Sequence, residues 1–151
     1  LFEKPASYAP FPWKVEADDQ KYRRSVYVFR RRSTPFPFLG TFDVPNGETA
    51  CVKRVKSNTP LQALMTLNET LSMEAAEHLA LRMIQEASGD DAKAITRGFT
   101  LCTGRTPSEK ESQLLLDLLK RQRETAAAED AKPMVVVARV LLNLDETITK
   151  E

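Results

Sequence analysis

From residue 58 onward, apolar residues recur along the chain at intervals of three and four. This spacing is that of an α-helix with one buried face, so the pattern predicts a mostly α fold. The run Val135-Val136-Val137 alone would favour a strand, but the helical spacing continues through it. The predicted helices cover about residues 60–67, 68–89, 90–104, 107–127 and 133–148.

Capping sequences mark the expected helix ends. Thr59-Pro60-Leu61-Gln62 places a hydroxyl before a proline and a glutamine three residues after the cap, which satisfies free backbone amides. Thr106-Pro107-Ser108-Glu109 repeats this arrangement. Asn68 and Asp90 are expected to cap the second and third helices, and Gly104 to end the third.

The apolar faces of these helices are expected to form one core. The large residues assigned to it are Leu64, Leu67, Leu79, Met83, Ile84, Ile95, Phe99, Leu114, Leu115, Leu118, Leu119, Val137, Val140, Leu141, Leu144 and Ile148. A chain of 151 residues with 42% hydrophobic content is long enough for one domain with a core of this kind. No apolar run approaches the length of about 20 residues that a membrane-spanning helix needs.

The pattern changes before residue 58. Residues 1–17 contain prolines at three positions and are expected to form an extended arm, because proline interrupts regular helices. Residues 20–33 are predicted to form a helix capped by Asp18 or Asp19. Turn residues between 35 and 57 flank two short extended candidates, 41–44 and 51–55, the second of which could equally be a short helix.

The sequence therefore predicts a helical bundle of about five to six helices with an irregular arm rich in proline and aromatic residues, and it allows one small β-hairpin. Residues 1–57 would comprise the arm, a basic helix and a turn-rich segment packed on the bundle. Residues 58–151 would form the bundle itself. The two parts together would make one domain, the C-terminal fragment of a larger chain.

Charge is divided unevenly between these parts. Residues 1–57 hold eleven Lys or Arg against six Asp or Glu, a net charge of +5, whereas residues 58–151 have a net charge of −4. Nucleic-acid binding is therefore only a third hypothesis, because the basic excess is local. Ten of the eleven aromatic residues lie between positions 2 and 42. Six of them are expected to form a surface for self-association or for docking an upstream domain: Phe2, Tyr8, Phe11, Trp13, Phe36 and Phe38.

The residues needed for familiar catalytic or cofactor chemistry are sparse. His78 is the only histidine, and we expect it at the edge of a buried helical face rather than in a nucleophile pair. Cys51 and Cys102 match no metal-ligand spacing, and no glycine-rich phosphate-binding motif is present. We therefore expect no complete catalytic constellation, no metal and no cofactor in this chain.

An arginine-rich segment is the first candidate site. On a helix, Arg23 and Arg24 would lie above Arg30 and Arg31, with Tyr27 one turn from both rows. Guanidinium groups around an aromatic ring suit phosphate, sulfate or carboxylate groups. Alternatively, these arginines pair with acidic residues of the helical region or of a missing upstream region.

A polar segment is the second candidate. Asp43, Arg54, Asn58 and Thr59 lie close in sequence to a helix N-terminus and could form an anion pocket. They could equally form an internal salt-bridged loop. In an enzymatic alternative, Asp43, Arg54 and Asn58 would contribute part of a hydrolase or lyase site that an upstream domain completes.

Several of these segments also carry a family resemblance. They are Tyr22-Arg23-Arg24-Ser25-Val26-Tyr27, Thr41-Phe42-Asp43-Val44-Pro45, Cys51, Arg54, Ser57-Asn58-Thr59-Pro60-Leu61-Gln62-Ala63-Leu64, Gly104-Arg105-Thr106-Pro107 and Ala138-Arg139-Val140-Leu141-Leu142-Asn143. In them the chain resembles the C-terminal domain of unknown function of the large exported planctomycete proteins that carry an upstream cytochrome-c-like domain.

The resemblance implies a periplasmic or extracellular setting and upstream domains of the same chain as partners. It provides no catalytic residues, and the Cys-x-x-Cys-His haem signature is absent from this sequence. The leading interpretation is a non-catalytic interaction or structural module of an exported multidomain protein that engages anionic polysaccharide.

Overall fold

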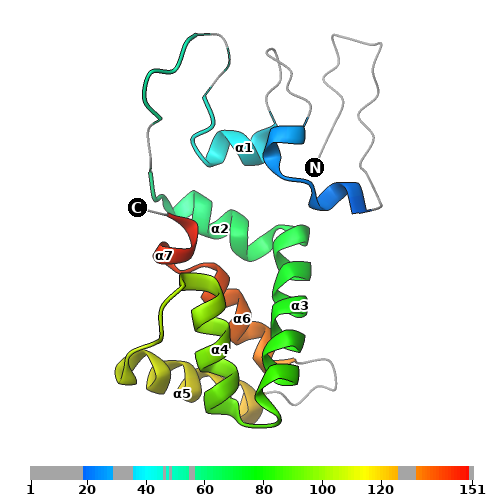
Figure 1. The fold of residues 1–151 in the computed structure, drawn as a ribbon, viewed down its shortest axis with the longest axis vertical. Helices are drawn as coiled ribbons and strands as arrows, with labels where there is room; N and C mark the ends of the chain where they lie inside the picture. Colours follow the sequence, from blue (N-terminus) through cyan, green and yellow to red (C-terminus); the bar gives the residue numbers. More distant parts are fainter. Residues whose placement is uncertain are drawn as a thin grey trace. The chain divides into compact units, whose positions relative to one another are not determined.

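A computed structural model describes residues 19–28, 36–45, 47, 49–54, 57–125 and 132–149. The chain divides into two compact units, Leu1–Ser57 and Asn58–Glu151, each of which is described by itself. All regular structure in the described ranges is helical, and none of these residues forms a strand (Figure 1). The predicted mostly α fold is confirmed.

The second unit is a bundle of helices. Its described helices are α2 (Pro60–Asn68), α3 (Thr70–Ala87), α4 (Asp91–Thr103), α5 (Glu109–Thr125), α6 (Pro133–Leu142) and α7 (Asp145–Ile148). The central element is α6, which packs against α3, α4 and α5 (Figure 1). Its buried residues are Met134, Val137, Ala138 and Leu141. Because α6 is apolar over most of its surface, it can fill the middle of the bundle.

Small residues bring the bundle helices close together. The fully buried core includes Ala76, Ala80, Ala94 and Ala138. At Gly98 of α4 a β-carbon would lie 2.5 Å from the sulfur of Met83, so the buried Met83 side chain of α3 packs directly on the glycine and would have to shift for any larger residue. These small residues share the core with large ones on the same helices, such as Met83 of α3 and Ile95 and Phe99 of α4.

Most of the large residues predicted for the core lie in it or pack against it. Phe99 and Leu115 are buried as predicted, and Leu79, Leu118 and Leu144 pack partly buried against the core. Leu67 and Ile148 are also only partly buried. The assignment was wrong for Leu64, Ile84, Leu114 and Val140, which are exposed. The other large residues assigned to the core are fully buried as predicted: Met83, Ile95, Leu119, Val137 and Leu141.

The predicted capping residues are confirmed at two of four helix starts. Thr59 and Gln62 form the reciprocal capping box of α2. The Thr59 amide donates to the Gln62 side chain at 3.0 Å, and the Gln62 amide donates to the Thr59 hydroxyl at 3.3 Å. The Asp90 carboxylate caps α4 by accepting from two backbone amides. Gly104 ends α4 with φ 85°, a left-handed conformation that glycine adopts at little cost.

The other two predicted caps were wrong by one or two residues. Glu69 rather than Asn68 caps α3, because the Asn68 side chain donates to the carbonyl of Leu64 and Asn68 remains in α2. The start of α5 is set by Ser108 and Glu111, which bond to each other's backbone amides, and not by Thr106. A second capping box in the same stretch of sequence therefore moves the helix start.

The expected single helix over residues 133–148 is divided into α6 and α7. Asn143 ends α6, and Leu144 is extended with ψ 144°. The Asn143 side chain accepts a hydrogen bond from the Thr66 hydroxyl of α2. Asn143 therefore bonds to another helix at the point where α6 ends, and the prediction of one helix was wrong.

Polar contacts hold α2 on the bundle. Besides the bond between Thr66 and Asn143, Asn58 donates to Asp145, and Arg139 donates to the carbonyl of Leu67 at 2.8 Å. Gln62 on the inner side of α2 is only 1% exposed. The outer side carries Leu61 and Leu64, each 57% exposed. The burial of α2 is thus the reverse of that of an ordinary amphipathic helix.

The described part of the first unit contains short elements only. They are two 3₁₀ turns, η1 (Asp19–Tyr22) and η2 (Ser25–Tyr27), and the helix α1 (Pro37–Thr41). The predicted helix over 20–33 was wrong for residues up to 28, all of which are exposed, so no apolar burial stabilises a longer helix. Residues 29–35 lie outside the described part.

The small hairpin allowed by the sequence is absent from the described residues of 41–44 and 51–54. Thr41 is the last residue of α1, and Asp43 has a left-handed backbone with φ 57°, which does not fit a strand. Aromatic contacts give this unit its local packing, since the Phe38 ring lies 6.3 Å from that of Phe36 and 4.8 Å from that of Phe42. The predicted arm, residues 1–17, and the remainder of the predicted aromatic surface lie outside the described residues.

Candidate functional site

Arg23, Arg24 and Tyr27 form a compact group that we call the arginine–tyrosine cluster. The guanidinium carbons of Arg23 and Arg24 lie 5.9 and 5.8 Å from the centroid of the Tyr27 ring, within the range of a cation–π contact. The 3₁₀ turn η2 positions the ring, because the Tyr27 amide donates to the carbonyl of Arg24 at 2.9 Å. All three residues are exposed. Arg30 and Arg31 lie outside the described residues.

The charges of the arginine–tyrosine cluster are not neutralised locally. Among the residues that the structure describes, no carboxylate forms an ion pair with Arg23 or Arg24. The cluster is therefore a positively charged, solvent-accessible surface with an aromatic centre. Guanidinium groups stacked on a ring keep their edge N–H donors available for anions.

Arginines of the bundle behave differently, since most of them pair with carboxylates. The ion pairs are Arg82 with Glu86, Arg97 with Glu86, Arg105 with Glu111 and Glu146, and Arg123 with Asp91. The pKa of Glu86 is lowered by hydrogen bonds from Arg82 and Arg97, and that of Asp91 by hydrogen bonds from Arg123. Four acidic residues of the bundle are thus already bound to its own arginines.

The polar segment is a set of internally bonded groups. Asp43 accepts hydrogen bonds from the amide and hydroxyl of Ser57 at 2.8 and 2.7 Å, and Arg54 donates to the carbonyl of Phe42 at 3.4 Å. In the second unit, Asn58 donates to Asp145 and Thr59 caps α2. Each predicted residue of this segment therefore has a partner within its own unit.

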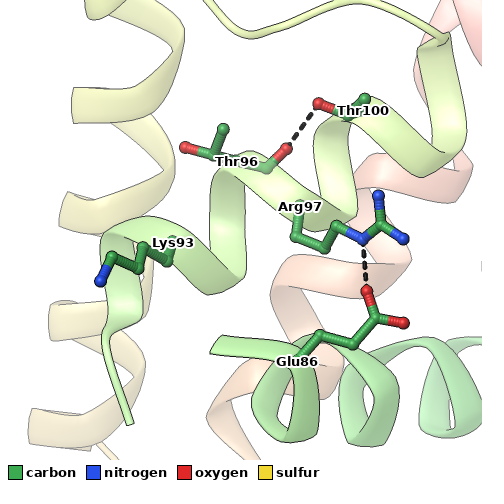
Figure 2. Close-up of a pocket in the computed structure, with 5 residues that line it drawn as sticks. All are labelled: Glu86, Lys93, Thr96, Arg97 and Thr100. Atoms are coloured by element: carbon green, nitrogen blue, oxygen red, sulfur yellow. Dashed lines mark hydrogen bonds and ion pairs between the residues drawn. The ribbon is translucent and has the colours of Figure 1, made fainter. Parts of the chain in front are cut away.

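A shallow hollow lies between α3 and α4 and was not anticipated from the sequence (Figure 2). Figure 2 shows Arg97 directed toward Glu86, whereas Lys93 points away from this pair. The hydroxyls of Thr96 and Thr100 donate to backbone carbonyls of α4 at 2.8 and 2.9 Å. With its hydroxyl donors and its one carboxylate already bonded, the hollow offers no convergent set of free groups to a ligand.

Arg105 organises a second unanticipated group. Its guanidinium binds Glu111 at 2.7 and 3.0 Å and Glu146 at 2.7 and 2.9 Å. It also lies over the Phe99 ring, 4.8 Å from the centroid. Arg105 thereby links the end of α4 to α5 and α7. Because two carboxylates occupy its donors, we assign Arg105 a structural role. Its partner Glu146 lies 41 residues away in the sequence, and no local pattern predicted their contact.

Glu111 makes stability depend on pH in a definite window. Hydrogen bonds from Arg105, and then from Ser108, lower its pKa from 4.5 to about 2. A carboxylate with a lowered pKa in the folded state stabilises the protein above its unfolded pKa, and this contribution is lost as pH falls from about 4.5 toward 2. The substitution Glu111→Gln should therefore lower the urea midpoint of unfolding at pH 7. Its effect on the midpoint should become progressively smaller as the pH falls through that window.

The matched control for this prediction is Glu109→Gln, because Glu109 is exposed at the same helix start and has no hydrogen-bond partner in the described chain. Urea denaturation of both variants and the parent protein at pH 7, 4.5, 3 and 2 measures the effect. A difference between Glu111→Gln and the parent protein that stays constant over these values would contradict the assigned role.

The described ranges contain no assembled site for a metal ion or for catalysis by a thiol or a histidine. No group of three or more His, Cys, Asp or Glu residues there could hold a metal ion. Neither Cys51 nor Cys102 forms a disulfide, and His78 is exposed. None of the helices in these ranges has the length and apolar character required to cross a membrane.

Comparison with known proteins identifies the family. Residues 3–119 match the family model described as "PSD1: Protein of unknown function (DUF1553)". The match covers well over half of the chain, so the protein belongs to this family of unknown function. No curated protein and no solved structure matches the chain. The functional argument therefore depends on the site geometry.

Proposed function

We propose that this chain is a non-catalytic interaction module that binds anionic polysaccharide through the arginine–tyrosine cluster. The observation that carries the proposal is the pair of guanidinium groups held on one exposed ring without a carboxylate partner among the described residues. Planar guanidinium groups bind carboxylate and sulfate groups through two parallel hydrogen bonds. Carboxylate and sulfate are the anionic groups that polysaccharides carry.

The alternative that these arginines serve internal ion pairs is less favoured. Glu86, Asp91, Glu111 and Glu146 are bound to arginines of the bundle itself. A second group of bundle carboxylates is also in use, because Asp90 and Glu69 cap helices. These acidic side chains, all among the described residues of the bundle, are therefore already committed to partners of their own unit.

The biological setting is part of the same proposal. We propose that the chain is the C-terminal module of a larger exported planctomycete protein with an upstream cytochrome-c-like domain, working in the periplasm or outside the cell. The family resemblance of segments such as Tyr22-Arg23-Arg24-Ser25-Val26-Tyr27 supports this setting. The upstream domains would then be the module's first protein partners, and any haem would belong to them.

Titration of the protein with dextran sulfate, uncharged dextran and duplex DNA at physiological salt tests the proposed function. We expect binding to dextran sulfate alone, and loss of that binding in the double variant Arg23→Glu with Arg24→Glu. Calorimetry gives the affinities, and circular dichroism shows whether the helices remain. Three polymers are needed because charge attraction alone also binds DNA in a salt-dependent manner.

Arg121→Glu is the matched control, since Arg121 is an exposed arginine of α5 with no carboxylate partner in the described chain. It should bind dextran sulfate as the parent protein does. Equal binding of DNA and dextran sulfate would favour nucleic-acid binding. Absence of binding to dextran sulfate would refute the proposal and leave the arginines with a structural role.

A further inference from the structure

We propose that the arginine–tyrosine cluster is a bivalent site that engages two anionic groups of one polysaccharide chain at once. This inference rests on the proposed function and adds the arrangement of charges that the ligand must have. The two guanidinium groups share one ring as their support, at 5.9 and 5.8 Å from its centroid. Their carbon atoms therefore lie no more than about 12 Å apart if both remain in cation–π contact.

Each guanidinium group is suited to one anionic group of its own. Its donors lie in a plane and form a fork that matches a single carboxylate or sulfate through two parallel hydrogen bonds. Arg23 and Arg24 have no carboxylate partner among the described residues, so both forks are available. Two available forks within one short span would select two anionic groups that are held within the same span.

The shared ring lowers the cost of binding at both positions. An exposed arginine side chain ordinarily loses rotamer freedom when it binds an anion. Contact with Tyr27 restricts Arg23 and Arg24 in advance, and η2 fixes the ring relative to the Arg24 backbone. Because the two groups are held together, the second contact becomes intramolecular once the first has formed.

Screening also favours two ligand groups over a single one. At physiological ionic strength, exposed charges separated by more than about 8 Å interact only weakly. An anion that is bound to the edge of one guanidinium group would attract the second guanidinium group only weakly if the two groups are farther apart than this distance. Two neighbouring sugars that each carry an anionic group would bind both guanidinium groups. A free sulfate ion or a singly charged sugar would bind only one of them.

The decisive comparison uses two forms of one disaccharide, maltose with a sulfate on each sugar and maltose with a sulfate on one sugar. Calorimetry at physiological salt should show that the doubly sulfated form binds at least about tenfold more tightly, well above the twofold statistical factor. Arg23→Ala and Arg24→Ala should each reduce the affinity for the doubly sulfated form to that for the singly sulfated form. Arg121→Ala should leave the tenfold difference unchanged.

The role of the ring is tested by Tyr27→Leu, which keeps an apolar side chain but removes the cation–π contacts. We expect this variant to lose most of the preference for the doubly sulfated disaccharide while retaining the helical circular dichroism of the parent protein. A preference equal to that of the parent protein would show that Tyr27 does not organise the two arginines, and would overturn the shared-ring site.

The outcomes separate this inference from the proposed function. If dextran sulfate binds through Arg23 and Arg24 but the two disaccharides bind within a factor of two, one anionic group bridges both arginines and bivalence is wrong. The polysaccharide-binding function would then stand. If dextran sulfate does not bind at all, both the function and the bivalent site are wrong.

Discussion

Replacing Phe99→Ala should lower the free energy of unfolding by about 3–5 kcal/mol, the largest effect we expect from a single change. Phe99 is buried in α4 and belongs to the central core. Its ring also lies under the Arg105 guanidinium, which binds carboxylates from α5 and α7. Truncation would leave a cavity and remove the surface on which Arg105 rests. Urea denaturation monitored by circular dichroism measures the loss.

Phe99→Leu is the matched comparison, because it keeps most of the apolar volume but removes the ring. It should be less destabilising than Phe99→Ala, and the remaining difference from the parent protein includes the lost contact with Arg105. A loss below about 1 kcal/mol for Phe99→Ala would place this side chain outside a well-packed core.

Leu119→Ala should lower the free energy of unfolding by about 2–5 kcal/mol, whereas Leu114→Ala should change it by no more than about 0.5 kcal/mol. Both residues belong to α5, but Leu119 is 1% exposed and Leu114 is 62% exposed. The two substitutions remove the same atoms from one helix, so the comparison isolates burial from helix propensity. Chemical denaturation of both variants under identical conditions measures the contrast.

Equal losses for Leu119→Ala and Leu114→Ala would mean that α5 presents a different face to α4 and α6. The sequence pattern alone assigned both residues to the buried face. This pair of variants therefore distinguishes the face found in the structure from the broader face expected from periodicity.

Local signals in the sequence were sufficient to predict the helical elements of the bundle. Helix starts such as Thr59 and Asp90 depend on bonds within one turn, which neighbouring residues determine. The buried faces were predicted less well, because apolar periodicity does not reveal how closely two helices approach. At Gly98, for example, the Met83 side chain packs directly on a residue without a side chain, and the apolar pattern does not predict this contact.

Contacts between residues distant in sequence account for most of the remaining differences. Asn143 interrupts the last predicted helix through a bond to Thr66, which lies 77 residues earlier. The predicted proximity of Tyr27 to Arg23 and Arg24 is found in the structure, but 3₁₀ turns rather than an α-helix produce it.

The reversed burial of α2 bears on how the bundle avoids alternative packing arrangements. Rotating α2 about its axis to cover Leu61 and Leu64 would bury these two leucines, so their burial alone disfavours the observed orientation. Such a rotation would expel Gln62 from its buried position and separate Thr66 from Asn143. Buried polar groups that lose their partners are costly. Directional hydrogen bonds thus select one rotational state of this helix, and conformational uniqueness is obtained there at the expense of apolar burial.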